Sequence, residues 1–530
     1  MAEPEVKRSD SQVMRNEPPV NMKEEFLDLL SMSWQVSLAT VTRIALTSID
    51  SAFLGHFGTQ YLAAASLAQV WTSLPLMAVW GGTAALITLC GQAWGAGNKE
   101  LVGIWLQFGV IITQFLGLLV FIWYWCVGFV LQYSSPDPVV VEAGVEFARM
   151  LSFSIAPSLF YACLRQYFQA MGIMWATTIC GVTSILLTVL LNWLLIYGCF
   201  GWSGLGFIGS PLATVIASWY QPLCLFLLCV TWKGYHKDAW YGFDRNALSV
   251  ERLKVFGGIA FPVAMNSLVS TLANSALTLL AARMGSDVIA ANAVMGGLWS
   301  IIWALFWGFG CSTQVKVANY MGAGRPQASR KVALCGLACS IVVLLILLST
   351  IFFASRKFFG IYSNDPKILD MCEDVVYIYI VAVLIENLEV LSAAVLTGMG
   401  SVSIIFWIST IGTWLIEIPV AFVLGIVYKK GLAALWISIL VMEIFKLSFF
   451  IGKLMMINWA EQSALVMASM EALPEEDEEA EALLPGGLTA RRKSSVFEVT
   501  KRDSRRLSEA MATSLENSTL MNSSQQKQPI

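Results

Sequence analysis

The chain of 530 residues is 57% hydrophobic, and only 13% of its residues are charged, about half the charged share of a soluble domain. Apolar runs long enough to cross a bilayer recur along the chain, and its mean hydropathy is +0.67, which excludes a soluble globular protein. The net charge of −3 is segregated rather than spread, and no nucleic-acid partner is expected. The sequence predicts an all-α membrane protein.

Apolar runs between polar, glycine or proline breaks predict twelve transmembrane helices. In chain order the expected spans are 27–54, 63–90, 101–132, 139–170, 175–199, 206–232, 253–283, 287–316, 330–354, 368–396, 402–427 and 431–458. We expect an N-terminal six-helix bundle at 26–232, a cytosolic linker at 233–252, a C-terminal six-helix bundle at 253–458, and disordered cytosolic tails at 1–25 and 459–530. The opening segment has no basic region followed by an apolar stretch and a cleavage site, so no cleaved signal peptide is expected.

Basic residues indicate the orientation of these helices. The even number of spans puts both termini on one side, together with the basic residues of 233–252 and 316–331, against a smaller group at 356–367 and 429–430. By the positive-inside rule both termini are expected in the cytosol. The membrane is expected to be the plasma membrane or a vacuolar or endolysosomal membrane.

The two sets of six helices carry an internal repeat. Gly58 matches Gly285 and Gly95 matches Gly322, each pair 227 residues apart, and the "QAMG" ending at 172 and the "TGMG" ending at 400 are 228 apart. One register held over more than a hundred residues predicts two homologous halves in the same membrane orientation, related by an axis along the membrane normal.

Cofactor and enzyme signals are weak. The eleven cysteines show no ligand spacing, and two histidines cannot build a histidine metal centre, so no metal, disulfide framework or resident cofactor is expected. "GAGNKE" and "GAGRPQ" lack the strand and the Gly-Lys-Ser/Thr ending of a phosphate loop. With no nucleophile–base pair either, an enzyme is disfavoured.

Six motifs occur in order along the chain. They are "DSAFLGHFGTQYLAAASLA" (50–68), "CGQAWGAGN" (90–98), "LRQYFQAMG" (164–172), "NWLLIYG" (192–198), "VANYMGAGR" (317–325) and "ENLEVLSAAVLTGMG" (386–400). Across 25–458 the chain resembles the multidrug and toxic compound extrusion (MATE) transporters of eukaryotic type. The resemblance implies two bundles around a central cavity, alternating access, and cation-coupled export of organic solutes.

Glu386 and Glu389 lie inside an otherwise apolar span, where each charge costs about 2.5–3.5 kcal/mol. A spacing of three puts both on one helical face, so we expect both in one cavity. Two close carboxylates in a poorly solvated place cannot both ionise easily, so the pair is expected to exchange protons. The resemblance places Glu386 at a family aspartate and Glu389 at a family glutamine. The alternative is that either residue merely faces cavity water or pairs locally.

Asp50 is a third proton-coupling candidate. The resemblance aligns it with an aspartate at the end of the first helix that couples protons or sodium in some relatives, and places Asn192 in the same site. Asp50 lies near the end of its span, so snorkelling to water is the alternative. Arg43, seven residues earlier, is a possible electrostatic partner.

Some relatives carry glutamates eight and thirteen residues after the proline of the seventh helix, where this chain has Ser270 and Ser275. Asn266, Ser270 and Asn274 instead form a polar stripe, and with Asn192 they are the candidate substrate-binding residues. The alternative is hydrogen bonding between helices. The missing glutamates put selectivity for organic cations in doubt.

The remaining membrane charges are expected to be structural. Glu443 and Lys446, three residues apart, predict an ion pair. Glu417 precedes a proline, at a place where a kink frees backbone groups. Arg149 and Arg165 match arginines of the family's fourth helix and are expected to hold packing or a gate rather than to touch substrate.

The C-terminal tail holds possible signals. Glu479, Leu483 and Leu484 resemble an acidic dileucine sorting signal, and Ser494 and Ser508 follow paired arginines, a pattern that basophilic kinases prefer. Sorting adaptors and kinases are therefore candidate partners, and a plain disordered spacer is the alternative.

Together these features predict a monomeric antiporter, surrounded by membrane lipids, that exports small organic solutes (organic cations, xenobiotics or organic acids) in exchange for protons. A sodium-coupled exporter of the same fold and a flippase of a lipid-linked substrate are the alternatives.

Overall fold

The computed structural model describes residues 17–134, 136–198, 202–244 and 248–471, and within these ranges the regular structure is entirely helical. The first half contains α2 (Met22–Phe57), α3 (Thr59–Gly82), α4 (Ala85–Gly95), α5 (Lys99–Cys126), α6 (Gly128–Ser134), α7 (Pro138–Leu151), η1 (Ser152–Ser154), α8 (Ile155–Ala170), α9 (Trp175–Tyr197), η2 (Gly206–Ile208), α10 (Gly209–Phe226), η3 (Leu227–Trp232) and η4 (Tyr235–Asp238). The second half contains α11 (Val250–Met284), α12 (Ser286–Gly322), α13 (Pro326–Phe353), α14 (Ser355–Phe359), α15 (Pro366–Gly398), α16 (Val402–Ile411), η6 (Gly412–Glu417), α17 (Ile418–Phe422), η7 (Val423–Val427), α18 (Leu432–Met456) and α19 (Trp459–Glu471).

Helices occupy all twelve predicted spans. Within the described ranges, nine helices are long and apolar enough to cross a membrane by length and composition. The other three predicted spans, 27–54, 139–170 and 368–396, are also helical. Large apolar side chains such as Phe115, Leu118 and Ile346 are exposed on the outer helices, as lipid contact requires. The prediction of an all-α membrane fold is confirmed.

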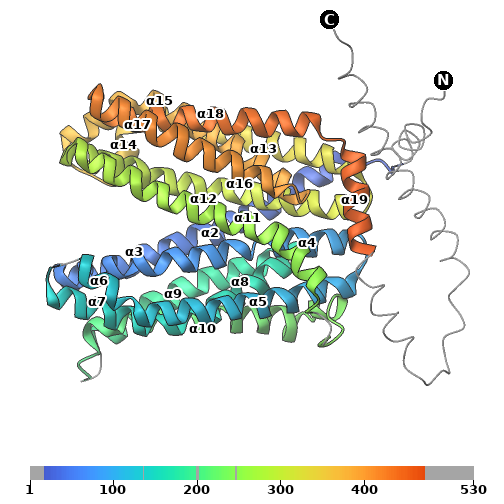
Figure 1. Ribbon diagram of the computed structural model, residues 1–530, viewed down its shortest axis with the longest axis horizontal. Helices are drawn as coiled ribbons and strands as arrows, with labels where there is room; N and C mark the ends of the chain where they lie inside the picture. The colour runs from blue at the N-terminus through green and yellow to red at the C-terminus, as the bar shows by residue number, and fades with distance from the viewer. Residues whose placement is uncertain (1–16, 135, 199–201, 245–247, 472–530) are drawn as a thin grey trace, which may run out of the picture. The chain divides into compact units, whose positions relative to one another are not determined.

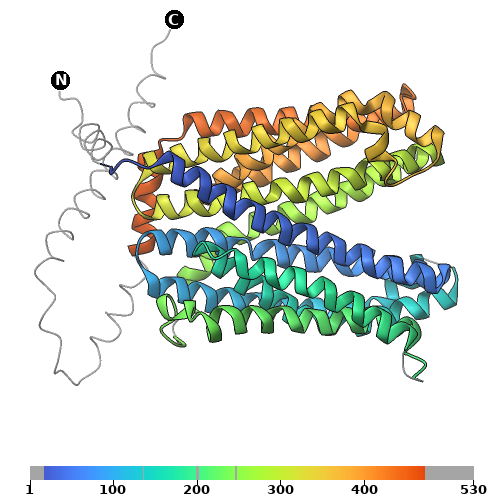
Figure 2. The ribbon, with the colours of Figure 1, turned by 180° about the vertical axis from the view of Figure 1, so that it is seen from behind.

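The helices form two groups, α2–α10 and α11–α18 (Figure 1). The long helix α2 connects them: it starts beside the second group and ends within the first (Figure 2). In its first turn, Glu25 forms an ion pair with Lys316 of α12, 3.1 Å between Oε2 and Nζ, and further along α2 the Ser37 hydroxyl donates to the Leu305 carbonyl of α12. The first helix thus ties the two halves together.

The predicted repeat is visible in the backbone. Gly97 and Gly324, 227 residues apart, both adopt left-handed backbone angles, with φ of 77° and 67°, which glycine reaches without strain. Each ends the turn that follows a matched helix, α4 in the first half and α12 in the second. Equivalent residues therefore build equivalent turns in the two halves.

The two halves meet closely where α4 crosses α12. A Cβ on Gly95 would collide with the carbonyl oxygen of Asn319, and a Cβ on Gly322 would collide with that of Gln92. Both glycines and both carbonyls are again 227 residues apart, so the crossing is symmetric. Hydrogen bonds beside it run from Gln92 Nε2 to the Gly398 carbonyl and from Thr88 Oγ1 to the Thr397 carbonyl, both 3.0 Å. We call this crossing the closed end.

Helix α19 covers the closed end, and it corrects the predicted boundaries of the tail. Residues 459–471 were expected in a disordered tail, yet Val466 and Met470 are buried. Ser463 Oγ donates to the Met321 carbonyl of the second half at 2.8 Å, and Asn98 Nδ2 of the first half donates to the Met470 carbonyl at 3.3 Å. The segment is ordered because apolar side chains four residues apart give it one face to bury.

The N-terminal tail and the linker are also shorter than predicted. Within 1–25, α2 already begins at Met22, and the Glu17 carboxylate accepts from the backbone N–H groups of Gln327 and Ala328 at 3.0 and 3.1 Å. A carboxylate at the start of α13 caps that helix. Within the linker 233–252, η4 forms and α11 starts at Val250.

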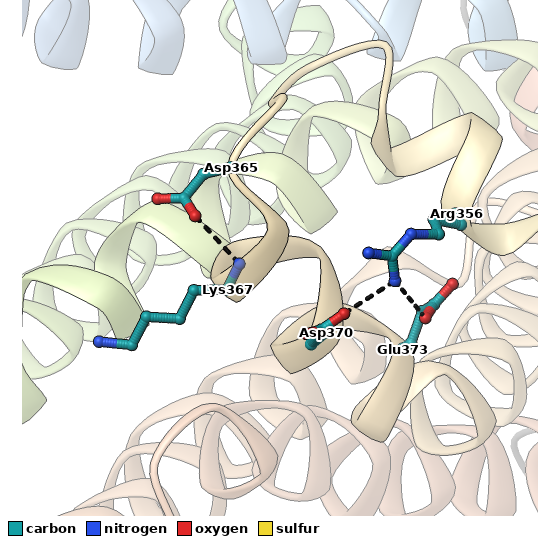
Figure 3. Close-up of polar contacts among 5 residues, drawn as sticks. All are labelled: Arg356, Asp365, Lys367, Asp370 and Glu373. Carbon is teal, nitrogen blue, oxygen red and sulfur yellow. Dashed lines mark hydrogen bonds and ion pairs between the residues drawn. The ribbon is translucent and has the colours of Figure 1, made fainter.

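The end of the second half farthest from α19 is held by ion pairs at the α14–α15 corner (Figure 3). Asp365 caps α15, its Oδ1 accepting from the Lys367 backbone N–H at 3.0 Å. The Arg356 guanidinium donates to Asp370 at 2.8 Å and to Glu373 at 2.9 Å. These exposed pairs lie outside the cavity described next.

Candidate functional site

A cavity of about 770 Å³ lies between the two halves and is lined by residues of both. This volume suits a drug-sized organic molecule. Its charged lining residues are Arg43 and Arg165 in the first half and Glu386, Glu389, Glu417, Glu443 and Lys446 in the second. Tryptophans 80, 299, 303 and 307 also line it. Aromatic walls with a few charged groups match a site for amphipathic solutes.

Glu386 faces this cavity from α15, as its position in the sequence predicts. Its side chain is buried, and its Oε2 accepts a hydrogen bond from Trp299 Nε1 of α12 at 2.5 Å. Among the described ion pairs, none includes Glu386. A buried carboxyl with one neutral donor can change its protonation state without breaking an ion pair.

Glu389, one turn further along α15, also lines the cavity but has a basic partner. Lys446 Nζ of α18 lies 3.2 Å from Glu389 Oε1 and 2.9 Å from Glu443 Oε1. The predicted Glu443–Lys446 pair is therefore present, and Lys446 also bridges to α15. Of the two glutamates, Glu389 is the one that pairs locally.

Glu417 adds a fourth carboxyl to the same wall. It ends the π-helical turn η6, two residues before Pro419, which has no backbone N–H to donate and therefore disturbs the preceding turn. Glu417 is buried and lines the cavity. The wall thus has four carboxyl groups and one ammonium group, which pairs with only two of them. Such an excess of buried carboxylate is costly unless protons or a bound cation compensate for it.

Asp50 occupies a separate polar site within the first half. Asn192 Nδ2 of α9 donates to Asp50 Oδ1 at 2.8 Å, and Thr214 Oγ1 of α10 donates to Asp50 Oδ2 at 3.0 Å. Asn192 is fully buried and is not among the cavity-lining residues. The structure brings Asn192 to Asp50, in the same site as the resemblance implies, and a contact of Asn192 with substrate stays a prediction. Thr214 was missed, since nothing in its sequence context separates it from other membrane threonines.

The prediction that Arg43 is the electrostatic partner of Asp50 is wrong. Its guanidinium lies over the Trp80 ring, 4.6 Å from the centroid, and faces the cavity. Arg165 lies over the same ring at 4.9 Å and lines the cavity too. The expectation that Arg165 only holds packing or a gate did not anticipate this position.

The polar stripe of α11 reaches the cavity. Asn266, Ser270 and Asn274 all line it, and Asn266 Oδ1 is buried without a hydrogen-bond partner in the described part of the chain. Ser275 is not among the lining residues, and its hydroxyl donates to the Thr271 carbonyl at 3.1 Å. The stripe therefore offers three side chains to a ligand. Glu479, Leu483, Leu484, Ser494 and Ser508 lie outside the described residues.

Two helical groups around a cavity that contains buried charges are an arrangement found in membrane transporters. The MatE family model matches residues 36–194 and 262–423, one segment in each half. The chain belongs to this family, and the resemblance to eukaryotic-type MATE transporters is confirmed.

Relatives and solved structures agree with this assignment. An uncharacterized transporter of Saccharomyces cerevisiae is 25% identical over 441 residues, 82% of this chain and 62% of that protein, so the chain spans less than two thirds of it. Multidrug and toxin extrusion protein 1 of Homo sapiens is 25% identical over 453 residues, 85% of this chain and 78% of that protein. The crystal structure of the eukaryotic MATE transporter AtDTX14 superposes with a TM-score of 0.76 at 21% identity, covering 85% of this chain and 99% of that one.

Proposed function

We propose that the protein is a secondary active antiporter that exports small organic solutes in exchange for protons by alternating access. The observation that carries the proposal is Glu386, a buried carboxyl that faces the cavity and has a tryptophan N–H rather than a basic group as its partner. Names of relatives such as "Multidrug and toxin extrusion protein 1" support small organic solutes as the cargo.

The exchange uses the two protonation states of Glu386. As a neutral acid it tolerates its apolar surroundings, and as a carboxylate it adds to the excess negative charge of the wall formed with Glu389, Glu417 and Glu443. Lys446 serves both Glu389 and Glu443, so a proton arriving on either one leaves the ammonium paired with the other. Proton uptake and release thereby change the charge of one wall of the cavity.

Alternating access requires the two halves to separate at the closed end. With both termini in the cytosol, the closed end and α19 face the cytosol. The hydrogen bonds of Gln92 and Thr88 to the end of α15 then break when the cavity opens inward. A membrane potential of 100 mV supplies about 2.3 kcal/mol per charge, and each pH unit of gradient adds about 1.4 kcal/mol, so no nucleotide hydrolysis is needed.

Sodium coupling through Asp50 is the second candidate. Asn192 Oδ1 is buried and has no hydrogen-bond partner among the described residues, and together with the Asp50 carboxylate it offers hard oxygen ligands of the kind that such cations prefer. A flippase is less favoured, because the cavity has more acidic than basic groups.

Purified protein in liposomes tests the proposal. A panel of labelled solutes is offered under an imposed pH gradient, with and without sodium, and transport driven by pH and indifferent to sodium is expected. Glu386→Gln should remove pH-driven transport, whereas Glu373→Gln, on the same helix but in the exposed pair with Arg356, should retain it. Normal exchange by Glu386→Gln would contradict the proposal, and scrambling of lipid would support the flippase.

A further inference from the structure

The first half contributes two arginines to the cavity wall. Arg43 of α2 and Arg165 of α8 lie over the ring of Trp80 on α3, at 4.6 and 4.9 Å from its centroid. All three residues line the cavity. Three helices of one half therefore bring two guanidinium groups to one aromatic ring.

These guanidinium groups lack an acidic partner. Among the ion pairs and hydrogen bonds of the described residues, no carboxylate contacts Arg43 or Arg165, and Arg165 Nε is buried without a hydrogen-bond partner. The carboxyl groups of the cavity are all on the other half. Stacking on Trp80 recovers only part of the cost of holding two like charges together away from water. An anion from solution would supply the missing partner.

The surrounding groups favour a particular kind of anion. Guanidinium is the side chain that best recognises planar carboxylates, through paired N–H donors. Trp303 and Trp307 of α12, which are stacked with centroids 5.1 Å apart, line the same cavity and offer an aromatic surface to the rest of the ligand. The cavity wall is thus basic in the first half and mainly acidic in the second, and tryptophans of both halves line it.

We propose that Arg43 and Arg165 form a subsite for the carboxylate of the exported solute, so that the protein takes aromatic organic acids in preference to simple organic cations. This inference rests on the proposed export function and specifies its substrate class. Arg43 and Arg165 bind the carboxylate, and the aromatic part of the solute lies along the tryptophans of α12.

Equilibrium binding to the full-length protein in nanodiscs, without any gradient, tests the subsite. Calorimetric titrations use 2-naphthoate, its neutral amide 2-naphthamide, and 2-naphthyltrimethylammonium, which share one aromatic body and differ in charge. The wild type should bind the carboxylate at least roughly tenfold more tightly than the other two probes. Equal binding of the three, or no binding of the carboxylate, would overturn the inference.

Substitutions of Arg43 and Arg165 test whether these two residues form the subsite. Arg43→Gln and Arg165→Gln should each weaken naphthoate binding by roughly tenfold or more, and Arg43→Lys should restore part of the loss because it keeps the charge without the planar fork. Arg149→Gln is the matched control, since Arg149 also lies over a tryptophan, Trp125 at 5.4 Å, but does not line the cavity. Unchanged binding by the double variant Arg43→Gln/Arg165→Gln would refute the subsite. Binding is measured without a gradient and does not depend on proton coupling, so loss of pH-driven exchange with naphthoate binding retained would overturn the exchange mechanism and leave the subsite standing.

Discussion

The two halves of the molecule share a backbone frame but differ in chemistry. Gly95 and Gly322 each lie against a backbone carbonyl of the other half, and the turns at Gly97 and Gly324 both have left-handed backbone angles. In the same register Ser270 stands where the first half has Arg43, and both residues line the cavity. Duplication thus preserved the positions needed for helices to cross, whereas the charges that face the cavity diverged.

The largest difference in transport rate is expected between a variant that removes Glu386 in the second half and a variant that removes Asp50 in the first half. Glu386→Gln should lower pH-driven exchange by at least roughly a hundredfold, because an amide cannot take up or release the proton that we propose Glu386 exchanges. Asp50→Asn should leave it within roughly threefold, since Asp50 lies outside the cavity and keeps neutral donors that can also bond an amide. Transport by proteoliposomes measures both. The opposite order of effects would move the coupling site into the first half.

The symmetric crossing can be broken at either of its two glycines. Gly95→Leu and Gly322→Leu place a side chain against the backbone of the other half, so the closed end cannot form and exchange should fall by roughly tenfold or more. Gly257→Leu is the matched control, because no atom lies within 4 Å of a Cβ built there. Because Thr397 also lines the cavity, a cysteine introduced there is probed with a membrane-impermeant thiol reagent added from the side of α19, and its labelling reports the opening of the closed end. If one glycine variant opens this end and the other does not, the crossing is not symmetric in function.

Sequence patterns predicted the features that depend on one helix or on the repeat. Spacing of three residues placed Glu386 and Glu389 on the cavity wall, and the shared register located the turns. These patterns did not predict contacts between helices that are remote in sequence. The sequence predicts only Glu443, in the same helix, as the partner of Lys446, because the distance from Lys446 to Glu389 depends on how α18 packs on α15. Arg43 was assigned to Asp50 along one helix, whereas its actual partner is the Trp80 ring of the next helix.

Helix α19 illustrates a different limit. Hydropathy drops after residue 458, so the segment was assigned to the tail, although Val466 and Met470 mark an apolar face of two residues one turn apart. Such a short stripe has too few positions to stand out from a disordered segment. Its burial depends on a surface formed by both halves, which no local pattern contains.

The docking of α19 predicts a smaller effect than the crossing. Val466 packs with Val317 and Met321, so Val466→Asp buries an unpaired charge and should release the helix, lowering the midpoint of thermal unfolding by roughly 2–4 °C. Ala468→Asp makes the same change at an exposed position of α19 and should leave the midpoint unaltered. A scan of detergent-solubilised protein measures both midpoints. Equal midpoints for the two variants would mean that the helix does not stabilise the closed end.

The smallest expected effect is a difference in solute binding between variants of two serines on α11. Ser270 lines the cavity, whereas the Ser275 hydroxyl is already bonded to its own helix. Ser270→Ala should weaken binding of a transported solute by roughly two- to fivefold, the loss of one neutral hydrogen bond. Ser275→Ala should change nothing, because its hydroxyl contributes no contact to the ligand. Titration of both variants with the same solute checks this. An equal loss in both would mean that the polar stripe acts through helix packing, and the comparison between the halves would then rest on the charged residues alone.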